Sequence, residues 1–276
     1  RMKQYLKRYL KKNVPARWLE LFSYKAVSMT KIPPTDAVIS DLFVLRVEDG
    51  WETIFECLQL ETLLNPSKKG DIQTLIFCFY TKTGKFIKER KVTLSNEIKT
   101  TININQLVED LTIEEDGLFA IFHPQKKYWI RQHDSFLAER GYIGYANSRL
   151  GPIKGYVHGN LDAIARSDSL RTDLLLGNYS FFKKEYRLQH SLEPGNNYEL
   201  YLVNPTLTKQ RFNLVQKTNQ KEDRIKVDLP PMGLYKYVKT VDKNEDTTFI
   251  IIESKLYLAR PVVFKIMPLS FDVFHG

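Results

Sequence analysis

The side chains best suited to chemistry in this sequence lie between residues 133 and 160. His133 is followed directly by Asp134, and His158 belongs to the segment GPIKGYVHGN at 151–160. Imidazole and carboxylate groups are common metal ligands, and a histidine oriented by a carboxylate is a common general base. These three residues are compatible with a metal site or with a hydrolase-like centre. They meet no stricter ligand spacing, and isolated histidines serve turns and hydrogen bonds more often. We therefore expect neither a metal nor a cofactor.

Glycine and tyrosine are abundant in the same stretch. Five of the thirteen glycines fall within residues 141–159. One interpretation is a structural joint, because glycine permits turns that other residues resist. The other is a joint that also forms a site, because a cleft between domains offers a ligand two walls and tyrosine rings stack on sugars or bases. The predicted ligand-binding residues of this interdomain cleft are His133, Asp134, Arg140, Tyr142, Tyr145, Lys154, Tyr156, His158 and Asn160.

Familiar catalytic motifs are missing from the sequence. It contains no phosphate-binding Walker loop, no dinucleotide-binding glycine fingerprint, no HExxH, no paired CxxC and no GxSxG. The two cysteines, Cys57 and Cys78, lie in strand-like runs and are expected to be small core residues of a protein in a reducing compartment. The missing motifs count against the commonest enzyme classes.

Positive charge is concentrated at the N-terminal end. The chain carries a net charge of +9, from 41 Lys and Arg against 32 Asp and Glu. Residues 1–35 contain nine of the basic residues and one acidic residue, which leaves 32 basic and 31 acidic residues, a net +1, for the other 241. A nearly neutral body does not match a surface that follows nucleic-acid phosphates, so nucleic-acid binding is expected only through this basic segment.

The basic segment has the pattern of a short amphipathic helix. Met2, Leu6, Tyr9 and Leu10 are spaced three or four residues apart, or adjacent, and form one apolar stripe among basic side chains. Such a helix packs on its own protein, or docks on an anionic membrane surface or in a partner's groove. The residues predicted to contact a partner or membrane are Lys3, Lys7, Arg8, Lys11, Lys12 and Trp18. KIPPTD at 31–36 is expected to be an extended linker.

After residue 35 the sequence predicts strands, and it repeats itself. Alternation with period two, as in TTINI, is typical of half-buried strands, and TKTGK at 81–85 is expected to be a hairpin tip. An ordered series of matching segments indicates an internal duplication. The segments that match, in order, are 36–60 with 162–190, 73–94 with 198–218, 100–107 with 224–231, 116–122 with 232–238, and 133–140 with 253–260.

The predicted fold class is all-β: two tandem antiparallel β-sandwich domains, related by internal duplication and preceded by a short basic amphipathic helical arm. No run of eighteen apolar residues is present, so the sequence itself excludes a transmembrane helix. The predicted boundaries are 1–35 for the arm and linker, 36–145 for the first sandwich repeat, 146–161 for the Gly/Tyr-rich interdomain connection and 162–276 for the second sandwich repeat.

The leading functional hypothesis is a non-enzymatic binding or assembly protein that uses the tandem sandwiches and the arm for recognition. The expected partners are a protein or an anionic membrane surface through residues 1–30, a carbohydrate or other polar ligand, and a second copy of the chain through sheet edges. We expect a cytoplasmic location, peripheral at a membrane if the arm docks there. Two alternatives stay open: a hydrolase-like or carbohydrate-active enzyme with a His/Asp site in the interdomain cleft, and nucleic-acid binding through the arm.

Overall fold

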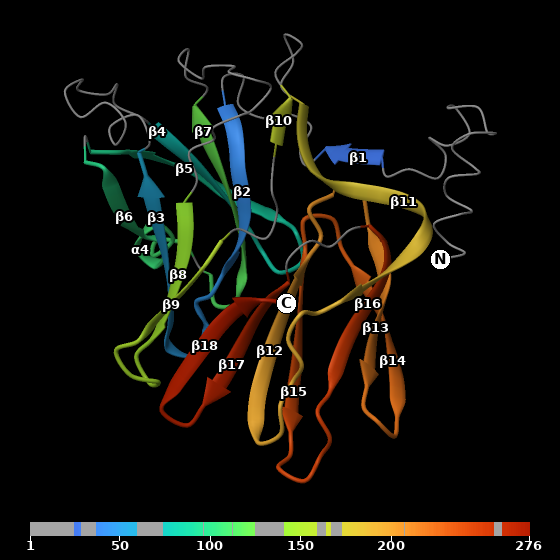
Figure 1. Cartoon of the computed structure of the whole chain (residues 1–276). Helices are drawn as coiled ribbons and strands as arrows, with labels where there is room; N and C mark the ends of the chain where they lie inside the picture. The colour runs from blue at the N-terminus through green and yellow to red at the C-terminus, as the bar shows by residue number, and fades with distance from the viewer. Residues whose placement is uncertain are drawn as a thin grey trace, which may run out of the picture.

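The protein is all-β, with four small antiparallel sheets arranged in a propeller-like ring (Figure 1). The structure is a computed structural model. It describes residues 25–28, 37–59, 74–95, 97–111, 113–124, 141–158, 164–166, 173–206, 208–256 and 261–276. The helical elements in these ranges are single turns, a 3₁₀ turn at Glu48–Gly50 and α4 at Ile104–Leu107.

Residues 37–158, the first half, form two of the sheets. Sheet I has the strand order β2-β7-β4-β5, and sheet II has the order β6-β3-β8-β9. Their strands are β2 (Ala37–Leu45), β3 (Trp51–Leu58), β4 (Thr74–Tyr80), β5 (Phe86–Thr93), β6 (Lys99–Asn103), β7 (Gly117–Pro124), β8 (Gly141–Asn147) and β9 (Lys154–Val157).

Residues 164–276, the second half, form the other two sheets together with the N-terminal strand β1. Sheet III has the order β1-β11-β16-β13-β14, with β10 also paired to β11, and sheet IV has the order β15-β12-β17-β18. Their strands are β1 (Lys25–Ser28), β10 (Ile164–Arg166), β11 (Asp173–Arg187), β12 (Asn196–Val203), β13 (Gln210–Lys217), β14 (Glu222–Leu229), β15 (Leu234–Val241), β16 (Phe249–Leu256), β17 (Val262–Met267) and β18 (Ser270–His275).

The two halves share one strand order. Numbered from β2 in the first half and from β11 in the second, both read 1-6-3-4 in one sheet and 5-2-7-8 in the other. This order relates β4 and β5 to β13 and β14. The sequence comparison instead matched 73–94 with 198–218, which contain β4 and β5 on one side and β12 and β13 on the other. That match is displaced by one strand, because short alternating strands resemble one another whatever their place in a sheet.

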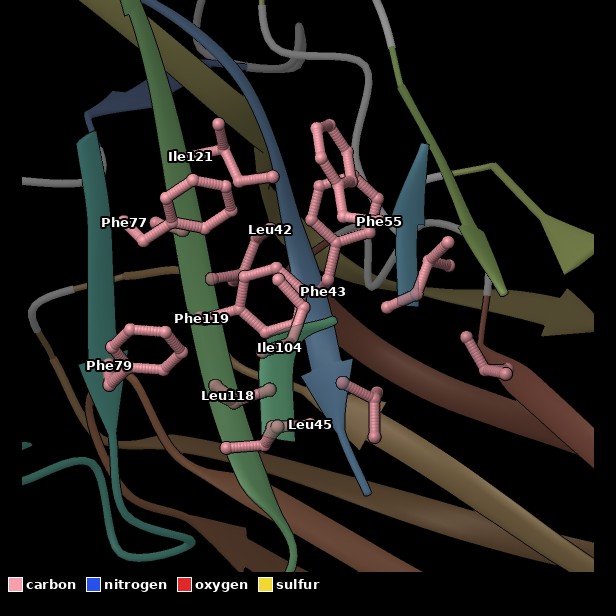
Figure 2. Close-up of a cluster of buried hydrophobic side chains, with 14 of the residues drawn as sticks. Leu42, Phe43, Leu45, Phe55, Phe77, Phe79, Ile104, Leu118, Phe119 and Ile121 are labelled. Carbon is pink, nitrogen blue, oxygen red and sulfur yellow. The ribbon is translucent and has the colours of Figure 1, made fainter. Parts of the chain in front are cut away.

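Sheets I and II pack face to face around an aromatic core. Phe43 and Phe77 from sheet I meet Phe55 from sheet II at ring-centroid distances of 5.5 and 6.0 Å (Figure 2). In β3 the buried side chains Trp51, Thr53, Phe55 and Cys57 alternate with residues on the opposite face, as the pleat of a strand requires.

Sheet IV is buried on both faces. Leu200 and Leu202 of β12 pack into a second core with residues such as Leu214 of sheet III. Tyr201 of the same strand, and Phe264 of β17, point the other way and join the core of the first half. The prediction of two separate sandwiches is therefore not supported as it stands, because a sandwich sheet has a solvated outer face and sheet IV contributes to both cores.

The predicted helical arm is not supported where the structure describes its segment. Lys25–Ser28 forms strand β1, which pairs antiparallel with β11. A four-residue segment satisfies more backbone groups by joining an existing sheet edge than by starting a helix, whose first turn is costly to form. The other arm residues lie outside the described residues, including Lys3, Lys7, Arg8, Lys11, Lys12 and Trp18.

Two further segments hold the halves together. The predicted hairpin tip at 81–85 is confirmed, and the carbonyl of Lys82 accepts a 2.8 Å hydrogen bond from the Leu234 amide of the second half. Strand β9, which lies inside the predicted connection 146–161, pairs with β8 and contacts β18. The GPIKGYVHGN segment therefore contributes an edge strand to sheet II rather than a free linker.

Candidate functional site: an aromatic platform on sheet II

The outer face of sheet II exposes three aromatic rings side by side. Tyr142 on β8 and Tyr156 on β9 are 43% and 41% exposed, and His158 follows directly after β9 and is also exposed. The Tyr142 and His158 rings lie 4.6 Å apart at an angle of 45°. We call these three residues, with Glu56 and Lys99 beside them, the aromatic platform.

Gly144 allows the Tyr156 ring to lie close to the sheet. The two residues are opposite each other in the β8–β9 pair. A Cβ atom at Gly144 would lie 2.6 Å from Cε1 of Tyr156, closer than carbon atoms approach. The ring therefore occupies the space that any other residue at position 144 would fill, and it presents a face to solvent instead of standing upright.

Glu56 supplies the polar edge of the platform. Its carboxylate accepts a hydrogen bond from the Tyr156 hydroxyl at 3.1 Å and another from the Lys99 ammonium at 3.1 Å. Partial burial has the larger effect and the hydrogen bond to Glu56 the next in raising the pKa of Tyr156. The platform thus combines ring faces with a carboxylate acceptor and an ammonium donor.

The sequence-predicted residues fall into three groups in the structure. Tyr142, Tyr156 and His158 are brought together on the platform, and Lys154 is exposed on the same strand as Tyr156. These four residues lie on β8 and β9 or directly after β9, at the edge of sheet II. Four more, His133, Asp134, Arg140 and Asn160, lie outside the described residues, and Tyr145 forms the third group by itself.

Tyr145 is wrong as a ligand-binding candidate because it is fully buried. Its hydroxyl donates to the carbonyl of Val44 at 2.9 Å, and its ring packs edge-on against Phe264. Burial raises the pKa of Tyr145 well above its ordinary value. It alternates with Gly144 along β8, so it points to the core while Gly144 lies on the opposite face of the strand, beneath the Tyr156 ring.

A second concentration of ionisable groups lies where the halves meet. Arg46 of the first half is 1% exposed, and its guanidinium lies 2.5 Å from the Glu199 carboxylate of the second half. Lys236 of the second half lies 3.5 Å from Glu48 and 3.8 Å from Asp116, both in the first half. Each half therefore places a cation against a carboxylate of the other, and we call these five residues the ionic clasp.

Aromatic rings enclose the ionic clasp. The Arg46 guanidinium carbon lies 3.8 Å from the centre of the Trp51 ring and 4.4 Å from that of Phe264. The Tyr201 hydroxyl donates to Asp116 at 2.6 Å, and its pKa is raised, chiefly by burial. Because Arg46 and Asp116 are both almost fully buried, a ligand has no direct access to them, and the clasp is a structural feature of the interface.

Comparison with known protein families and with curated proteins gives no match for this chain. In the described ranges, no three His, Cys, Asp or Glu side chains come together as metal ligands. Over the same residues, no helix has both the length and the apolar character needed to cross a bilayer.

Sequence reasoning missed the polar half of the platform. Glu56 and Lys99 lie far from Tyr156 along the chain, and only the sheet order β6-β3-β8-β9 brings them to its side. Alternation in WETIFECL does place Glu52 and Glu56 on the solvent face of their strand, which was the one available signal. The ionic clasp had a weaker signal still, a charged Arg46 directly after the apolar run LFVL at 42–45.

Proposed function

We propose that this protein is a non-enzymatic binding protein that recognises a carbohydrate on the aromatic platform. The observation that carries the proposal is the exposure of Tyr142 and Tyr156 on one sheet face, with the Tyr156 ring laid over Gly144. Exposed ring faces pack against the C–H surfaces of sugar rings, and the nearby carboxylate and ammonium groups exchange hydrogen bonds with hydroxyls.

The character of the platform favours a small polar ligand over a protein partner. Stable protein interfaces bury about 800 Å² on each partner around a core depleted of charge. The platform instead has three rings bordered directly by the Glu56–Lys99 ion pair. A hydroxyl-rich ligand satisfies these charged groups without having to desolvate them completely.

Binding to an array of neutral and acidic oligosaccharides, followed by titration calorimetry with an oligosaccharide that binds, tests this proposal. Tyr142→Ala and Tyr156→Ala should each weaken binding by roughly tenfold, because each removes one stacking ring. Phe86→Ala is the matched control, since Phe86 is an exposed aromatic residue, 52% accessible, on sheet I. Failure of every oligosaccharide to bind, or equal affinity of the two tyrosine variants and the native protein, would contradict the proposal.

The proposed scaffold for this site is a pair of tandem eight-stranded β-sandwich units derived from one ancestral unit. The identical strand order of the two halves supports this origin. The ionic clasp and the shared sheet IV core are then later additions that fix the units against each other. Superposition of β2–β9 on β11–β18, strand by strand in this order, tests the relationship.

The basic arm is proposed to bring the protein to an anionic membrane surface. Its support is the net charge of +8 over residues 1–35. Because Lys25–Ser28 belongs to sheet III, the appropriate deletion removes residues 1–24 and leaves β1 in place. Co-flotation of the native protein, but not of the deletion variant, with vesicles of anionic phospholipid is the expected result, and equal flotation of both would exclude the arm as the anchor.

A further inference from the structure

A depression lined by residues of sheet III gathers positive charge. Strands β13 and β14, which contribute to it, lie on the other side of the molecule from β8 and β9, which carry the platform (Figure 1). Three strands contribute to its wall, β11, β13 and β14. Its volume is about 450 Å³, enough for a small charged ligand. The lining residues are Lys183, Arg211, Asn213, Lys226 and Asp228.

Strand register places these side chains on one face. Arg211 is opposite Asp228, and Asn213 is opposite Lys226, in the β13–β14 pair. The alternate residues of β13, Phe212 and Leu214, are fully buried in the core between sheets III and IV. The polar members of the strand therefore face outward together.

The carboxylates at the depression are already matched by cations. Asp228 is held by Arg211 at 2.7 Å and by Lys209 at 2.8 Å. These hydrogen bonds lower the pKa of Asp228 to about 2, and the one from Arg211 has the largest effect. The neighbouring Glu253 accepts from Asn213 at 2.8 Å and pairs with Arg224 at 2.8 Å.

Two lysines that line the depression, Lys183 and Lys226, take no part in these ion pairs. Within the described part of the chain, no carboxylate lies within ion-pairing distance of Lys183 or Lys226. Both side chains are exposed, so their ammonium groups are available to a ligand. Arg211 donates to Asp228 through Nε and, at 3.5 Å, through Nη2, and its Nη1 keeps N–H donors that suit the oxygens of a phosphate or sulfate group.

We propose that this depression binds a tetrahedral oxyanion, namely a phosphate or sulfate group carried by a small molecule or a polysaccharide. Lys183 and Lys226 neutralise the anion, and Arg211 donates hydrogen bonds in an orientation fixed by Asp228. The site is independent of the carbohydrate platform. Because its charged groups are exposed, its affinity falls as salt concentration rises.

Titration calorimetry on the full chain tests this inference with four probes: inorganic phosphate, inorganic sulfate, a sulfated oligosaccharide and an uncharged oligosaccharide. The first three should bind and the last should not bind here. Lys183→Gln/Lys226→Gln should weaken anion binding by at least roughly tenfold, since charge-assisted hydrogen bonds are lost. A preference for the inorganic ions identifies a free oxyanion as the ligand, and a preference for the sulfated oligosaccharide identifies a polymer-borne group.

A matched control removes the same charge elsewhere on the same half. Lys217 and Lys221 are exposed but pair with Glu222 and Asp223, at 4.0 and 2.7 Å. Lys217→Gln/Lys221→Gln should therefore bind anions like the native protein. If both double variants weaken anion binding equally, the binding is non-specific charge attraction and the proposed site is wrong. Absence of anion binding by the native protein would also contradict the proposal. Tyr156→Ala should keep anion binding, which separates this result from the platform.

Discussion

At the scale of single residues, Arg46 has an unusual environment. It carries a positive charge that is almost completely removed from water, between the Trp51 and Phe264 rings and beside carboxylates from both halves. Its Nε and Nη1 atoms have no hydrogen-bond acceptor among the described residues, so the rings and the carboxylates together compensate the charge.

Arg46→Ala should lower the free energy of unfolding by about 3 kcal/mol, because it leaves buried Asp116 and the partly buried Glu199 with one cation, Lys236, between them. Urea denaturation measures the loss. Lys88→Ala is the control, since Lys88 forms an exposed pair with Asp110 and should change stability by less than about 1 kcal/mol. If Arg46→Ala/Glu199→Gln destabilises the protein by the full sum of the Arg46→Ala and Glu199→Gln losses, the two side chains are not coupled and this interpretation is wrong.

Asp228 gives a prediction on acid stability. Its folded pKa of about 2 is lower than the value near 4 of an unfolded aspartate. Its ion pairs therefore stabilise the fold fully above pH about 4, and the contribution is lost as pH falls toward about 2. Urea midpoints measured over this range should show native protein and Asp228→Asn converging at low pH. A difference between them that does not vary with pH would refute this assignment. The effect should be small, because Asp228 is exposed.

At the scale of elements, strands β8 and β9 determine which tyrosine side chains are exposed and therefore accessible to a ligand. The segment GYIGYAN alternates between solvent and core, so Tyr142 faces outward and Tyr145 inward although both occur in one glycine-rich run. Strand β9 then places Tyr156 opposite Gly144, and because glycine has no side chain the Tyr156 ring can lie close to the sheet.

Gly144→Ala should weaken carbohydrate binding while leaving the fold intact. The new methyl group would meet the exposed ring of Tyr156, whose side chain can rotate away at little cost to the sheet. The tilted ring then no longer lies level with Tyr142. We expect calorimetric titration to show weaker binding and urea denaturation to show an unchanged midpoint. Native affinity in this variant would show that the orientation of the Tyr156 ring does not matter for binding.

At the scale of the whole molecule, the two halves share one hydrophobic core. The core of the first half includes Tyr201, Met232 and Phe264 from the second half. The hairpin tip at 81–85 is also docked, with a Cβ at Gly84 lying 1.8 Å from the Pro231 carbonyl oxygen and with φ at +84°. We therefore expect one unfolding transition, with coincident signals from tryptophan fluorescence and circular dichroism.

Gly84→Ala should destabilise the protein by more than about 1 kcal/mol, because it combines an unfavourable positive φ with a backbone clash between halves. Gly195→Ala is the comparison: it has a φ of +78°, but its Cβ would meet only the flexible side chain of Lys243. Urea denaturation of both variants separates the two contributions. Equal losses would mean that the hairpin contact adds nothing to the cost of positive φ.

Several features of this protein follow from the sequence alone, because they depend on near neighbours in the chain. Alternation along segments such as TTINI and WETIFECL indicated strands, and the turn at 81–85 was readable from its glycine. The sequence also singled out Tyr142 and Tyr156, and both side chains are exposed in the structure. Local periodicity does not, however, say which strand a segment becomes within a sheet, and this is why the matched segments were displaced by one strand.

The tertiary structure settled every feature that joins distant parts of the chain. Glu56 meets the Tyr156 hydroxyl across 100 residues, and Arg46 meets Glu199 across 153. It also placed Tyr145 in the core, buried sheet IV on both faces and brought the ionic clasp together where the halves meet. The physical reason is that strand pairing and sheet packing join segments without regard to their separation in sequence, so no local pattern records the partner of a given side chain.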